Sequence, residues 1–76
     1  MFHVIEFIHD VPADLDVPGE GRLPQVLIQQ GTRLRAQITP YVHESARGPI
    51  EVADLFLEDD TTARGVRFAA FRFADQ

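Results

Sequence analysis

Residues 50–73 read IEVADLFLEDDTTARGVRFAAFRF, two apolar runs on either side of a short polar segment. Both runs are rich in branched and aromatic residues, which favour the pleated surface of a β-sheet. The Asp-Asp-Thr-Thr segment at 59–62 has the composition of a turn. The stretch therefore predicts a β-hairpin with strands over 50–57 and 66–73. For the first run a helix is the alternative, because Pro49 is acceptable at the first helical position.

Pairing Glu58 with Ala63 sets the register of this hairpin, because opposite residues in antiparallel strands keep a constant sum of residue numbers. Asp54 then lies opposite Arg67 and forms an ion pair with it. The residues on the predicted core face are Ala53, Leu55, Leu57, Val66, Phe68 and Ala70. The large side chains on the opposite face are Ile50, Val52, Phe56, Phe71 and Phe73. A ribbon that is apolar on both faces must be covered twice, so these five residues form the predicted interface.

The second apolar face has three possible covers: the N-terminal part of this chain folded back, a second copy of the chain, or another protein. Burying half of that face at about 25 cal/mol/Å² would contribute several kcal/mol, comparable to the whole stability of a domain of this size. An uncovered patch of this kind promotes aggregation. The sequence therefore favours a covered face and leaves the cover open.

The remaining apolar segments predict three further strands, over 2–8, 23–29 and 32–42. In the last of these, apolar and polar residues alternate with the period of two that is typical of a half-buried strand. Residues 10–21 are predicted to be a loop because Pro12 and Pro18 interrupt them, and Pro18-Gly19 fits the centre of a type II turn. Five strands with short connections predict a single all-β domain over residues 1–76, a small antiparallel five-stranded barrel or sandwich ending in the C-terminal hairpin.

Composition narrows the class of protein. The chain has 76 residues, no cysteine and a net charge of −5, which disfavours a disulfide framework and a nucleic-acid-binding surface. No segment has the length of a membrane span or the pattern of a signal peptide, so a cytoplasmic location is expected. Acidic and arginine-containing blocks alternate along the chain, which predicts ion pairs between neighbouring strands.

Residues with catalytic or metal-binding chemistry are few. The single serine, Ser45, lies next to Glu44 and near His43, but adjacent residues of one loop do not form a hydrolase triad, whose members come from separate segments. His3 and His9 would be about 20 Å apart on one strand, too far to share a metal ion. We therefore expect no enzyme, no metal and no cofactor.

Two functions remain. The first is a protein-interaction or self-association module, with a homodimer or another protein on the apolar hairpin face, because two-fold dimers are the commonest closed assemblies. The second is a small-ligand site for phosphate or a nucleotide, because guanidinium groups bind phosphate where they converge. The arginines of that predicted anion site are Arg33, Arg35, Arg64 and Arg67.

Overall fold

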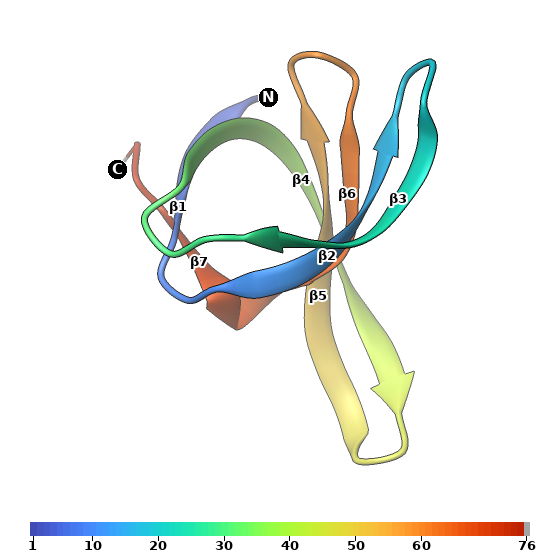
Figure 1. The fold of residues 1–76 in the computed structure, drawn as a ribbon. Helices are drawn as coiled ribbons and strands as arrows, with labels where there is room; N and C mark the ends of the chain where they lie inside the picture. Colours follow the sequence, from blue (N-terminus) through green and yellow to red (C-terminus); the bar gives the residue numbers. More distant parts are fainter. Residues whose placement is uncertain (76) are drawn as a thin grey trace.

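The computed structural model describes residues 1–75, and within them the chain is all-β, as predicted (Figure 1). The strands are β1 (His3–Phe7), β2 (Val11–Val17), β3 (Gly21–Ile28), β4 (Arg33–Ser45), β5 (Gly48–Leu57), β6 (Thr62–Arg67) and β7 (Phe71–Phe73), with a 3₁₀ turn, η1 (Phe68–Ala70), before β7. They form one antiparallel sheet in the order β3-β2-β6-β5-β4-β1-β7. No helix in this described part is long and apolar enough to cross a membrane.

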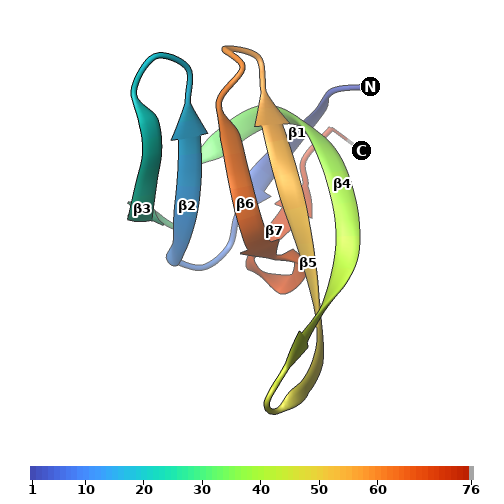
Figure 2. The same cartoon turned by 90° about the vertical axis from the view of Figure 1, so that its right-hand side faces the viewer.

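The sheet curls without closing into a barrel. Among residues 1–75, the edge strand β3 pairs only with β2, and the edge strand β7 pairs only with β1. The turn before β4 is tied to β1 by two hydrogen bonds, from the Phe7 amide to the Thr32 carbonyl (2.9 Å) and from the Gly31 amide to the Phe7 carbonyl (2.7 Å). Figures 1 and 2 show β4 arching from β5 to β1, its two neighbours in the sheet.

The core lies on the inner face of the curl. Ile5, Phe7, Leu55 and Val66 are completely buried there. The alternation predicted for residues 32–42 is confirmed as far as Ile38, since Ala36 is buried between half-buried Leu34 and Ile38 while the intervening residues are exposed. Residues 39–44 are exposed on both faces of β4. The ring of Phe71 packs at 5.8 Å from that of Phe7, so β7 contributes directly to the core.

The structure has seven strands in residues 1–75 rather than the predicted five. One of the two additional strands, β2, lies in the predicted loop, where Val11 and Ala13 are buried and Pro12 stays exposed. Alternating burial thus outweighs the proline in this segment. The turn at Pro18-Gly19 is confirmed: the Glu20 amide donates to the Val17 carbonyl at 3.0 Å, and the φ of Gly19 is +82°.

The C-terminal hairpin is confirmed in its first strand and wrong in its second. Residues 50–57 belong to β5, not to a helix. Its partner β6 ends at Arg67, and after η1 the chain joins the far side of the sheet, where Phe71 lies opposite Phe7. The second predicted strand, 66–73, is therefore split between two neighbours.

The predicted register of the hairpin is also wrong. Ala53 lies opposite Val66, and Leu55 lies opposite Ala63. The register shifts between these two pairs, because Gly65, with a φ of +65°, adds a residue to β6. The predicted Asp54–Arg67 pair is consequently absent from the ion pairs of residues 1–75.

Beyond the body of the sheet, β4 and β5 continue as a narrow ribbon. Residues 42–51, which we call the arm, pair only with each other within the described chain, from Val42 opposite Glu51 to Ser45 opposite Gly48. Figures 1 and 2 show the arm projecting away from the other strands. Isolated two-stranded ribbons are marginally stable in water, so the arm depends on the strands from which it extends.

Candidate functional site

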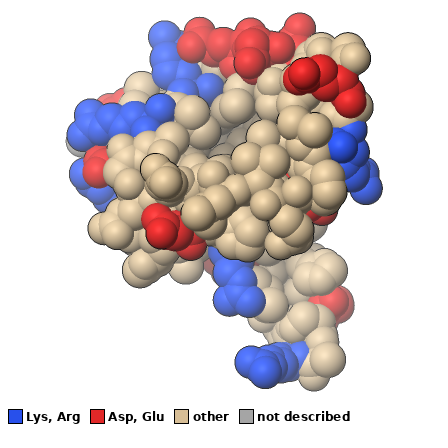
Figure 3. All heavy atoms as spheres, in the orientation of Figure 1, with Lys and Arg blue, Asp and Glu red and all other residues tan. Residues whose placement is uncertain are grey.

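The inner face contains an apolar hollow of about 310 Å³. Figure 3 shows this side of the molecule hollowed near its middle. The residues that line it are Leu15, Leu27, Ile28, Gln29, Thr32, Leu34, Leu57 and Ala63. None of these residues carries a charge, so the hollow offers contacts chiefly to an apolar group.

The hollow exists because small and large residues meet at the open side of the sheet. Ala63 of β6 lies opposite Leu15 of β2 and also opposite Leu55 of β5, so its methyl group leaves space between two leucines. Leu15, Leu34 and Leu57 pack against the core from one side and are only partly buried. The unclosed sheet supplies no further strand to cover them.

The turns at the ends of two strands that line the hollow carry carboxylates. The turn that follows Leu57 contains Glu58, Asp59 and Asp60, and the turn between β2 and β3 contains Glu20. Figure 3 shows acidic side chains gathered over both turns. The Thr61 amide donates to the Asp59 carboxylate at 3.0 Å, and this hydrogen bond lowers the pKa of Asp59.

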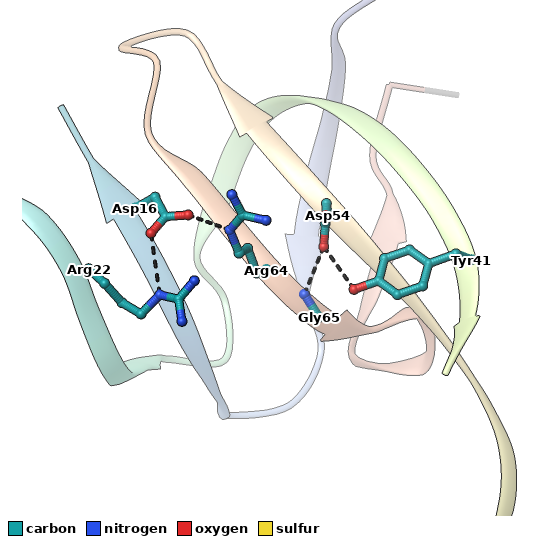
Figure 4. Close-up of polar contacts among 6 residues, drawn as sticks. All are labelled: Asp16, Arg22, Tyr41, Asp54, Arg64 and Gly65. Carbon is teal, nitrogen blue, oxygen red and sulfur yellow. Dashed lines mark hydrogen bonds and ion pairs between the residues drawn. The ribbon is translucent and has the colours of Figure 1, made fainter. Parts of the chain in front are cut away.

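On the outer face of the sheet, one carboxylate holds the bulge in β6. Asp54 Oδ1 accepts hydrogen bonds from the Tyr41 hydroxyl and from the Gly65 amide, both at 3.0 Å (Figure 4). Partial burial and the neighbouring Asp54 raise the pKa of Tyr41 above 10.0. The contacts join β4, β5 and β6 at the point where the register shifts.

A second outer-face contact continues across β6, β2 and β3. Asp16 accepts a hydrogen bond from Arg64 and lies 3.5 Å from Arg22 (Figure 4). The hydrogen bond from Arg64 lowers the pKa of Asp16, and the same contact raises the pKa of Arg64. These side chains already engage one another, so their arrangement is that of a structural network.

A separate groove of about 330 Å³ lies at the base of the arm. Its lining combines Pro40, Tyr41 and Val42 with Glu51 and Phe68. The side chain of Val42 is 57% exposed, so the groove places an exposed apolar side chain at the base of the arm.

The structure separates the five residues of the predicted interface. Val52 and Phe71 are each 5% exposed, and Phe73 packs against the core, so these three residues are covered within the chain, which is one of the covers that the sequence left open. Ile50 is half-buried in the arm, and Phe56 is 44% exposed. The transfer of β7 to β1 separates Phe71 and Phe73 from the three residues on β5.

The four arginines of the predicted anion site do not converge. Arg33 lies 3.2 Å from Glu6 of β1, and Arg35 lies 3.9 Å from Glu58. Arg64 pairs with Asp16 of β2, while Arg67 is exposed at the end of β6. Three of the four thus contact carboxylates on three different elements. These contacts confirm the expected ion pairing between neighbouring strands.

The serine and histidine residues form no catalytic arrangement within residues 1–75. The Ser45 hydroxyl donates to the Gly48 carbonyl at 2.7 Å and accepts from the Arg47 amide, as expected of a polar turn. His3 contacts Asp75 at 3.3 Å. No group of three or more histidine, aspartate or glutamate side chains in the described part could hold a metal ion.

The sequence analysis did not identify the hollow. Leu15 was assigned to a loop, while Leu57 was assigned to the core. The signal for the missing wall was the alternation of Val11, Ala13, Leu15 and Val17 with Pro12, Asp14 and Asp16. Comparison with protein-family models, curated proteins and solved structures finds no match to this chain.

Proposed function

We propose that this chain is a non-enzymatic protein-binding module that takes an apolar side chain of its partner into the hollow. The observation that supports this proposal is the uncharged lining of about 310 Å³ on the open side of the sheet. When a partner excludes the remaining water from partly buried leucines of this kind, the free energy of the complex falls. Burying one leucine-sized side chain contributes about 1.5–3 kcal/mol.

The edge strand β3 supports a protein partner over a free small molecule. β3 pairs with β2 on one side, and its residues Leu27 and Ile28 line the hollow. An extended segment lying along the other edge of β3 would meet unpaired backbone groups and place alternate side chains toward the leucines. Pro24 restricts such pairing to the end of β3 nearest the hollow, because proline has no amide hydrogen.

A random-peptide display selection on the whole chain tests this proposal. We expect the selected peptides to need one large apolar residue, shown by its replacement with alanine. Leu27→Asp places a charge at the mouth of the hollow and should weaken their binding by at least about tenfold. Val42→Asp is the matched control, because Val42 is 57% exposed and Leu27 is 55% exposed. Selected peptides that bind Leu27→Asp as tightly as the wild type, or a selection without binders, would contradict the proposal.

Self-association through the arm is a second candidate. It is supported by the ribbon that residues 42–51 form beyond the body and by the groove of Val42 and Phe68 at its base. Packing the arms of two copies together would cover these side chains and shelter the ribbon.

Sedimentation velocity distinguishes this candidate from a monomeric binding module. We expect a dimer for the wild type and a monomer for Val42→Asp. Phe56→Asp tests the part of the sequence-predicted face that remains exposed. A wild-type protein that sediments as a monomer at high concentration would rule out the dimer. For location, the lack of cysteine supports a reducing compartment such as the cytoplasm.

A further inference from the structure

We infer that the partner segment carries a lysine or arginine next to its apolar anchor, so that the cation meets the acidic turns above the hollow while the anchor occupies the leucine lining. This inference rests on the proposed function, since it specifies which peptide chemistry the same hollow selects. It draws on the charges of the two turns, which the binding of an apolar group alone does not use.

The lining itself cannot select for charge. Its side chains are aliphatic apart from Gln29 and Thr32, which are neutral. Any preference for a charged neighbour of the anchor must therefore come from groups at the edge of the hollow. Charged groups at the rim of an interface act mainly on specificity and on the rate of association.

The edge is acidic on the side of the β5–β6 turn. Glu58, Asp59 and Asp60 directly follow Leu57, which lines the hollow. Arg35 lies 3.9 Å from Glu58 and offsets one of these charges. Within residues 1–75, no cationic side chain forms an ion pair with Asp59 or Asp60.

The neighbouring turn adds to this field. Glu20 lies in the turn between β2 and β3 and has no cationic partner among the ion pairs of the described residues. Figure 3 shows the acidic side chains of both turns on the same side of the hollow. Asp16, by contrast, is neutralised by Arg64 and Arg22 on the outer face. A cation that flanks the anchor can therefore pair with carboxylates that no arginine of the described residues already neutralises.

The occupant that fits both features is an extended basic segment with a single leucine-sized residue. A negatively charged segment would place its carboxylates beside Asp59 and Asp60 and would be repelled. An apolar segment without charge would fill the hollow and leave the acidic turns unused. The order of affinity expected for flanking residues is accordingly lysine or arginine, then glutamine, then glutamate.

Four blocked synthetic peptides test this order by titration into the ¹⁵N-labelled chain. Their central residues are Lys-Leu-Lys, Gln-Leu-Gln, Glu-Leu-Glu and Lys-Ala-Lys, and the reporters are the backbone amides of Leu27, Thr32 and Ala63. Two rim ion pairs make Lys-Leu-Lys bind about fivefold more tightly than Gln-Leu-Gln at low salt. The difference should fall to less than about twofold at 0.5 M salt, where charges separated by more than about 4 Å are screened.

The double variant Glu20→Gln/Asp60→Asn tests the source of the preference. Asparagine is tolerated at the φ of +68° that Asp60 adopts, so the turn is retained. The preference for Lys-Leu-Lys over Gln-Leu-Gln should then be reduced in the variant, in which Asp59 is the remaining carboxylate of the two turns without an ion pair among residues 1–75. Glu44→Gln makes the same kind of charge change on the arm and should leave the preference intact.

The outcomes separate this inference from the proposed function. Tighter binding of Lys-Leu-Lys that is reduced in the double variant and unchanged in Glu44→Gln supports both. Equal binding of Lys-Leu-Lys and Gln-Leu-Gln overturns the charge inference and leaves the apolar hollow standing. Lys-Ala-Lys binding as tightly as Lys-Leu-Lys overturns the inference, because acidic turns alone would then account for affinity. An absence of shifts at the reporter amides with every peptide overturns the proposed function and the inference with it.

Discussion

The two faces of the curled sheet differ in how far their side chains have partners within the chain. On the outer face, Asp54 holds Tyr41 and the Gly65 amide, and Asp16 holds Arg64 (Figure 4). On the inner face, the buried core is complete around Leu55 but leaves other leucines half-covered around a hollow. The outer face therefore has its partners within the chain, whereas part of the inner face still lacks one.

This difference separates residues that maintain the fold from residues that are available to a ligand. A substitution in the outer network or in the closed part of the core should act on stability. A substitution at the mouth of the hollow should act on binding.

The largest effect should come from the closed part of the inner face. Leu55 is completely buried, so Leu55→Ala should lower the free energy of unfolding by about 3 kcal/mol through lost burial and a new cavity. Leu57 lines the hollow and is only partly buried, so Leu57→Ala should cost about half as much. Urea unfolding of both variants measures the difference. Equal losses would show that the hollow is as closed as the core and would contradict the difference between the two regions.

A smaller loss is expected from the outer network. Asp54→Ala removes the acceptor of two hydrogen bonds, from the Tyr41 hydroxyl and the Gly65 amide. The expected destabilisation is about 1–2 kcal/mol, because the bulge amide loses its partner. Asp54→Asn retains a carbonyl oxygen for that amide and should cost less. Urea unfolding of both variants checks this, and a loss from Asp54→Asn that equals the loss from Asp54→Ala would contradict the assigned role of the oxygen.

The ionisation of Tyr41 provides a local test of the same network. It is the only tyrosine, and tryptophan is absent, so absorbance at the phenolate band follows this residue alone. Partial burial and Asp54 raise its pKa above 10.0. In Asp54→Asn the pKa should move part of the way back, because the burial remains. The unfolded chain ionises first, so this contribution to stability is complete below pH 10.0 and is lost as the pH rises through the folded pKa. A wild-type value at or below 10.0 would contradict the contact.

The weakest stability effect in this series is expected at Asp16. Its pKa is lowered below 3.8, first by the hydrogen bond from Arg64. A carboxyl with a lowered pKa stabilises the fold above its unfolded pKa, and this contribution disappears as the pH falls through the folded value. Wild-type stability should therefore fall more steeply than that of Asp16→Asn below about pH 4. Parallel acid titrations followed by circular dichroism measure this, and superimposable curves would show that the pair contributes nothing.

Much of the local structure could be predicted from the sequence where the pattern of burial is simple. β4 alternates because one of its faces meets the core, and that period is visible in residues 33–38. β5 was predicted because residues 50–57 are rich in branched and aromatic side chains. β2 was missed because prolines such as Pro12 and Pro18 are typical of loops and turns. In the structure Pro12 is exposed and the residues on either side of it are buried.

The site could not be predicted, because it depends on long-range geometry. Gly65 shifts the register of β6, and η1 carries Phe71 to β1. Residues that the sequence places on one face of a hairpin therefore lie on strands that are not neighbours. The hollow further requires that β3 and β7 remain unpaired with each other. Leucines that line an unclosed core have the same sequence pattern as leucines in a closed one.

Whether the hollow accepts an apolar group can be tested directly by a methyl NMR titration of the wild-type chain with benzene. Benzene is an apolar probe that occupies leucine-lined cavities in other proteins. We expect saturable shifts at the methyl groups of Leu15, Leu34 and Leu57, with those of Leu55 and Val42 little changed. Shifts that are absent, or that spread evenly over all exposed methyl groups, would contradict this expectation.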